Sequence, residues 1–122
     1  MSNEKKFASI FDGLKAAYGT YKVDNKKLNG KSTGKAGVIR EARTQELWEG
    51  HLSGKGISIG IIPINEDNCC KWGCVDVDVY NLDHKALLAR IRKLKLPLVV
   101  CRSKSGGAHV FLFTTEWIAA KE

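Results

Sequence analysis

The sequence has no apolar run long enough to span a membrane, no secretory signal pattern and no internal repeat. Its cysteines include no C-x-x-C pair, and no second pair follows at the spacing of a zinc knuckle. These absences argue against a membrane-spanning helix, a repeat array and a small zinc module. Reduced thiols are the natural interpretation of the cysteines, so we expect a cytoplasmic protein; they are Cys69, Cys70, Cys74 and Cys101.

The composition is that of a globular chain with a basic balance. The 122 residues are 43% hydrophobic and 27% charged, which is enough for one domain, residues 1–122, with a core of its own. Because 20 Lys and Arg residues outnumber 13 Asp and Glu residues, the formal net charge is +7. This charge favours nucleic acid, nucleotides or acidic surfaces as partners, and an ordinary basic surface is the alternative.

Apolar periodicity and turn residues predict an α+β fold. Helices are predicted over residues 4–18, 44–54 and 83–94 and from near Glu116. Strands are predicted over residues 57–63, 72–80, 98–102 and 109–113. The section 72–102 is therefore a β-α-β unit, and a short turn joins its last strand to the next one as a hairpin. This order predicts a mixed sheet with flanking helices.

The segment 22–43 is rich in basic, glycine and hydroxyl residues. Its basic residues are Lys22, Lys26, Lys27, Lys31, Lys35, Arg40 and Arg43. The composition predicts a basic loop or a mobile hairpin, with a short strand near 37–40. Such a segment either grips phosphates as a flexible arm or is simply solvated, and the sequence leaves both open.

Two carboxylates, Asp76 and Asp78, alternate with valines along the strand predicted over 72–80. Residues at i and i+2 of a strand project from the same face, so the two carboxylates are expected side by side. Such a pair holds one or two hard divalent cations at phosphoryl-transfer sites. The alternative is a strand with one acidic, solvent-facing side.

A basic, glycine-rich turn follows downstream and leads directly into an apolar strand. Here Arg102 and Lys104 supply charge, Ser105 a hydroxyl, and the amides of Gly106 and Gly107 hydrogen-bond donors. Backbone amides and cations in a turn suit a phosphate group. In this context His109, which opens the strand, is a candidate phosphate ligand. A hairpin turn that is merely basic is the alternative.

Three other residues carry weaker signals. His51 and His84 lie on predicted helices and are expected at the surface. Trp72 either packs under the carboxylate strand, which we favour, or stacks on a base.

Together the two motifs resemble the archaeo-eukaryotic primase superfamily, which includes primase-polymerases and the polymerase domains of bacterial end-joining ligases. The first motif of that superfamily corresponds to Val75-Asp76-Val77-Asp78, and the second to the segment from Ser105 to Phe111. The sequence is most similar to the primase domains of TOTE conflict systems and related phage proteins. Further likeness lies in the loop 31–37, the helix 47–54 and the strand 59–63, so the resemblance covers most of the chain.

The resemblance implies part of a primase catalytic fold, with an RRM-like β-α-β unit plus a hairpin. It implies a nucleotidyltransferase that uses Mg²⁺ or Mn²⁺ and acts on nucleoside triphosphates and DNA in primer synthesis or extension, in a bacterial cell or a phage-infected host. Asp76 and Asp78 would bind the metal, and with His109 they would be the catalytic residues. The nucleotide would be bound by Arg102, Lys104, Ser105, Gly106, Gly107 and His109. DNA would be approached by Lys31, Lys35 and Arg40.

One departure concerns the third motif of the superfamily, a late strand with another aspartate that completes the metal site. After Phe113 the acids are Glu116 and Glu122, and neither follows an apolar strand pattern. We therefore expect a fragment of a longer primase, a subunit completed by a second polypeptide, or a truncated relative. A truncated relative would bind nucleic acid, nucleotide or a protein partner without polymerising. A metal-dependent nuclease is disfavoured, because no Lys or Glu follows the aspartates at nuclease spacing.

Overall fold

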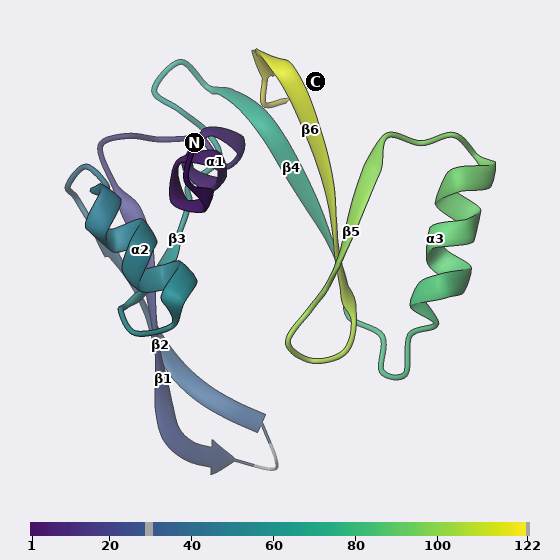
Figure 1. The fold of residues 1–122 in the computed structure, drawn as a ribbon, viewed down its shortest axis with the longest axis horizontal. Coiled ribbons are helices and arrows are strands. Elements are labelled where there is room, and N and C mark those ends of the chain that lie inside the picture. The colour runs from purple at the N-terminus through teal and green to yellow at the C-terminus, as the bar shows by residue number, and fades with distance from the viewer. Residues whose placement is uncertain (29–30, 122) are drawn as a thin grey trace. The chain divides into compact units, whose positions relative to one another are not determined.

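The structure is a computed structural model that describes residues 1–28 and 31–121, with side chains described for 1–24 and 33–121 (Figure 1). The chain divides into two compact units, Met1–Cys70 with Ala119–Glu122, and Lys71–Ile118. Its elements in chain order are α1 (Asn3–Ile10), β1 (Tyr18–Leu28), β2 (Lys31–Ile39), α2 (Gln45–Ser53), β3 (Ser58–Gly60), β4 (Cys69–Val77), α3 (His84–Lys93), β5 (Leu98–Arg102) and β6 (Ala108–Ala119). The predicted α+β class is confirmed.

The first unit contains an antiparallel sheet with strand order β2-β1-β3. Strands β1 and β2 form a hairpin, so the basic segment adopts one of the two conformations that the sequence left open. The core of this unit consists of Tyr18 from β1, Trp48 from α2 and Ile59 from β3. Helix α2 begins after Thr44, whose hydroxyl accepts from the Leu47 amide, and it ends at Gly54 in the left-handed conformation, as predicted.

Helix α1 is shorter than predicted, because it ends at Ile10 instead of continuing to residue 18. A Cβ at Gly13 would overlap the Ile62 carbonyl oxygen, and the Leu14 amide donates to that same oxygen over 2.8 Å. The chain after α1 is therefore held against backbone that follows β3. Tyr18, which the helical periodicity included, instead begins β1 and enters the core.

The second unit contains a sheet with strand order β4-β6-β5. Strand β6 is antiparallel to β5, with Cys101 opposite His109. It is also antiparallel to β4, because Thr114 bonds the Lys71 carbonyl while His109 reaches Asp76. The expected mixed sheet is therefore wrong: the described strands form two separate antiparallel sheets, and β4 and β5 do not pair in parallel because β6 lies between them (Figure 1).

Helix α3 packs on one face of the second sheet. The core there contains Ile91 of α3 with Ala108 and Val110 of β6. Partly buried side chains complete this core; they are Val77, Leu82, Leu87, Leu98 and Val100. Asp83 caps the helix by accepting from the Ala86 amide over 3.0 Å, as the sequence predicts.

Strand β6 replaces the last predicted helix, because it continues to Ala119. The segment contains Thr114, Thr115, Trp117 and Ile118, and β-branched and aromatic residues favour strands. The Thr114 hydroxyl also donates to the Lys71 carbonyl of β4 over 3.1 Å. Among the described residues, no helix is long and apolar enough to cross a membrane.

Candidate functional site

The two sequence motifs meet on neighbouring strands of the second sheet. Asp76 lies near the end of β4, and His109 near the start of β6. The His109 Nε2 atom lies 3.6 Å from the Asp76 Oδ1 atom, and the two side chains are 46% and 69% exposed. Because their chain neighbours Val77, Ala108 and Val110 belong to the α3-facing core, both side chains lie on the opposite face of the sheet.

Asp78 lies just beyond β4, which ends at Val77, and its side chain is exposed. The strand therefore stops short of the predicted end at Tyr80, where the chain turns toward the Asp83 cap of α3. Among the described residues, no group of three His, Cys, Asp or Glu side chains could hold a metal ion. Two carboxylates nevertheless suit Mg²⁺, which proteins commonly bind through one or two carboxylates together with substrate phosphates.

The glycine turn joins β5 to β6 and is closed by its own backbone. The Ser103 amide donates to the Gly107 carbonyl and the Gly106 amide donates to the Ser103 carbonyl, each over 3.1 Å. The hydroxyls of Ser103 and Ser105 lie 3.3 Å apart. Gly106 has a φ of 90°, which side chains on L-residues rarely allow. The Gly106 amide therefore already donates within the turn. The role of Gly106 is to shape the backbone, and not the predicted donation of its amide to a phosphate.

The turn is also attached to its neighbours through Gly107. A Cβ at this position would overlap the carbonyl oxygen of Val77 in β4. The Gly107 carbonyl lies 2.8 Å from the Nε2 atom of His84 at the start of α3. This bond fixes where the turn lies relative to the carboxylate strand and the helix.

His84 is therefore not the free surface residue that the sequence suggested, since its half-buried ring binds the turn. The Nδ1 atom of His51 similarly accepts from the Ile59 amide over 3.1 Å. Sequence reasoning missed both roles because the partner of each histidine is a backbone group. Such a partner cannot be recognised from the residue type.

The charged residues of the turn are accessible to a ligand. Arg102, Lys104 and Ser105 are exposed, and Lys104 and Ser105 belong to the turn itself. Lys104 and Ser105 lie in the turn that leads to His109, whereas Arg102 pairs with Ala108 of the α3-facing core and so projects from the other face of the sheet. A phosphate chain with a bound divalent metal carries negative charge that suits the basic side chains. Its metal carries positive charge that suits the carboxylates.

The family model for the archaeo-eukaryotic primase domain of TOTE conflict systems matches residues 6–122. The chain belongs to this family. The match includes both motifs and extends over both compact units, so the resemblance inferred from the sequence is confirmed. No curated protein matches the chain significantly.

Within this primase domain, Cys74 lies on β4 beside the carboxylates. Burial raises the pKa of the Cys74 thiol, and the negative charges of Asp76 and Cys101 raise it further, while a hydrogen bond with the Val110 backbone opposes them. Two cysteines therefore flank the Asp76 and His109 pair on the sheet. The shift favours the neutral thiol, so Cys74 adds no negative charge beside Asp76.

The basic residues predicted to approach DNA lie on the β1–β2 hairpin of the first unit or directly after it. Lys35 of β2 is directly opposite Lys22 of β1, and both side chains are exposed. Like charges in this position repel, so an anion between them would stabilise the hairpin. Arg40 is exposed just after β2. Lys31 begins β2, but its side chain is outside the described part.

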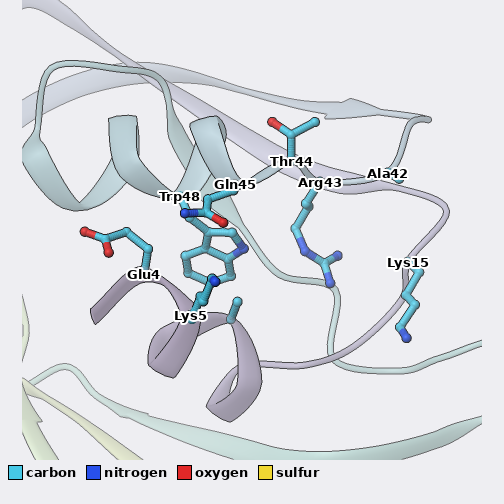
Figure 2. A pocket seen from close by; sticks show the side chains of 9 residues that line it. Glu4, Lys5, Lys15, Ala42, Arg43, Thr44, Gln45 and Trp48 are labelled. Carbon is cyan, nitrogen blue, oxygen red and sulfur yellow. The ribbon is translucent and has the colours of Figure 1, made fainter. Parts of the chain in front are cut away.

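The pocket in Figure 2 belongs to the first unit and contains none of the residues predicted from the sequence as a site. Lys5, Arg43 and Trp48 are among the residues that line it. The Arg43 guanidinium donates to the Leu14 carbonyl and lies 4.0 Å from Asp12, so it holds the loop after α1. We therefore assign this pocket no part in the primase site.

Proposed function

We propose that this chain forms the metal- and nucleotide-binding part of a primase-polymerase, a nucleotidyltransferase that makes or extends primers on DNA. The observation that carries the proposal is the 3.6 Å approach of Asp76 and His109 across β4 and β6. It joins the carboxylate motif to the phosphate motif on one face of one sheet. Family membership supports the same assignment.

Asp76 and Asp78 would hold Mg²⁺ or Mn²⁺, with phosphate oxygens of the nucleotide as further ligands. The metal, when bound, supplies positive charge against the charge that develops on the reacting phosphate. The triphosphate is bound and oriented by Ser105, His109, Arg102 and Lys104. Gly106 and Gly107 shape the turn of this motif. Most of this contribution is positioning and electrostatic stabilisation.

The hairpin of the first unit would bind the phosphates of DNA through Lys31, Lys35 and Arg40. Support comes from the lysines that oppose each other at Lys22 and Lys35. We propose that both compact units belong to one primase-like domain, residues 1–122, because the family match spans them. Polymerisation would need a further carboxylate, supplied by a partner polypeptide or by a longer form of this chain. The proposed setting is the cytoplasm of a bacterium or a phage-infected host.

The test is binding of a labelled nucleoside triphosphate to the 122-residue chain as Mn²⁺ is titrated. We expect binding that requires Mn²⁺, is lost in the double variant Asp76→Asn/Asp78→Asn and is weakened in His109→Ala. Glu116→Gln is the matched control, because it removes an exposed carboxylate from β6 of the same sheet. Equal binding by all four proteins would refute the site assignment.

A non-catalytic binding module is the second candidate, and the small number of candidate metal ligands favours it. No third ligand accompanies Asp76 and Asp78 among the described residues. Such a protein would bind nucleotide or DNA, or a protein partner, without extending a primer. A primer-extension assay with Mn²⁺ separates the two functions: product from the chain alone would exclude the binding module, and retained nucleotide binding without product would support it.

A further inference from the structure

A row of aromatic side chains continues from His109 along the same face of the second sheet. We call Trp72, Phe111 and Phe113 the aromatic row. The Phe111 ring centre lies 6.2 Å from that of His109, 6.1 Å from Trp72 and 5.7 Å from Phe113. The rings of Phe111 and Phe113 are stacked with an interplanar angle of 21°. The row therefore begins beside the proposed phosphate ligand and follows β6 away from the turn.

The aromatic row is separate from the core that holds α3 to the sheet. That core uses Ala108 and Val110, which alternate with His109 and Phe111 along β6. The three aromatic side chains are half-buried, so part of each ring surface can still be reached. Flat aromatic surface beside a group of cations is the chemistry that proteins use to bind bases together with phosphates.

The spacing along β6 matches the length of a nucleotide. A strand rises ~3.4 Å per residue, so Phe111 lies roughly 7 Å and Phe113 roughly 14 Å from His109 along the strand. A nucleoside triphosphate in an extended conformation places its base at a comparable distance from its terminal phosphate. A ligand held by the turn at one end would therefore bring its base over Phe111 or Phe113.

We propose that the aromatic row stacks on the base of the nucleotide whose phosphates are bound by the turn and His109. This inference rests on the proposed function and specifies where its substrate lies. Stacking uses the face of the base, which all nucleobases share, so the row discriminates little among them. Selection of the base is then left to pairing with a template.

The experiment compares two ligands in the presence of Mn²⁺: a nucleoside triphosphate and inorganic tripolyphosphate, which has no base. Phe111→Leu and Phe113→Leu are the test variants, and Phe111→Tyr retains the aromatic surface. Phe7→Leu is the matched control, because Phe7 stacks on Phe11 in the first unit. We expect Phe111→Leu to weaken triphosphate binding about tenfold while tripolyphosphate binding stays within about twofold. Phe111→Tyr and Phe7→Leu should bind both ligands like the unaltered chain.

The outcomes separate this inference from the function on which it rests. Unchanged nucleotide binding in both leucine variants would overturn the stacking but leave the metal and phosphate site standing. Equal loss of both ligands in both leucine variants would also overturn it, since no base-specific contact would then exist. Failure of the unaltered chain to bind either ligand would refute the proposed function itself. Similar affinities for the four common nucleotides, all lowered by Phe111→Leu, would support the inference.

Discussion

Replacing Gly107 with alanine tests the attachment of the glycine turn to the sheet. The added Cβ would overlap the Val77 carbonyl oxygen and lie 3.3 Å from the Ser103 hydroxyl. The carbonyl belongs to the backbone of β4, so the overlap is relieved only if the turn or the strand moves. Such a movement also lengthens the bond between His84 and the Gly107 carbonyl, which is 2.8 Å in the structure.

The expected destabilisation is the sum of two effects. Overfilling a packed site costs ~1–3 kcal/mol, and weakening the His84 bond costs roughly 1 kcal/mol more. We therefore expect Gly107→Ala to lower the free energy of unfolding by about 3 kcal/mol and the melting temperature by on the order of 10 °C. Because the shifted turn carries Ser105 and Lys104, nucleotide binding should weaken as well.

Two other glycines of the same unit serve as controls. Gly106→Ala meets no atom within 4 Å but forces a side chain onto a residue with φ of 90°, which costs ~1–2 kcal/mol. Gly73→Ala has neither problem and should be neutral or slightly stabilising. Urea unfolding followed by tryptophan fluorescence ranks the three variants. Equal stability of Gly107→Ala and Gly73→Ala would refute the close approach of the turn to β4.

Three further changes test other parts of the structure. Asp83→Ala should cost ~1 kcal/mol in urea unfolding because it removes the cap of α3, whereas Asp83→Asn should cost much less. Asp76→Asn should lower the pKa of Cys74 and speed its alkylation at pH 8, measured by peptide mass spectrometry, and an unchanged rate would contradict their proximity. Lys35→Ala with Arg40→Ala should reduce the salt dependence of DNA binding by about two units of slope, and an unaltered slope in fluorescence anisotropy would exclude both as phosphate contacts.

The sequence predicted the elements whose signals are local. The caps at Thr44 and Asp83, and the stop at Gly54, depend on residues within one turn of the helix, and all three are confirmed. The strand over residues 98–102 also has the predicted bounds. The close approach of Asp76 and His109 agrees with the family resemblance, because that resemblance assigns both motifs to one metal and nucleotide site.

Contacts between distant parts of the chain explain what the sequence did not reveal. The end of α1 depends on the approach of Gly13 to the Ile62 carbonyl, and the role of His84 depends on the Gly107 carbonyl. Both partners are backbone atoms, so no residue type marks them in advance. The pairing of β6 with both β4 and β5 is likewise a matter of topology, and periodicity within a strand does not determine its neighbours.

The short length of β3 has a consequence for the behaviour of the protein at high concentration. Strand β1 has 11 residues, but β3 pairs with only Gly19, Thr20 and Tyr21 among those described. Beyond Tyr21 that side of β1 is an edge whose backbone groups are able to pair with another chain. Lysines on edge strands oppose such pairing through charge repulsion, and Lys22 lies at the start of this edge. The basic hairpin would then keep molecules apart in solution, and neutralising its lysines would favour self-association.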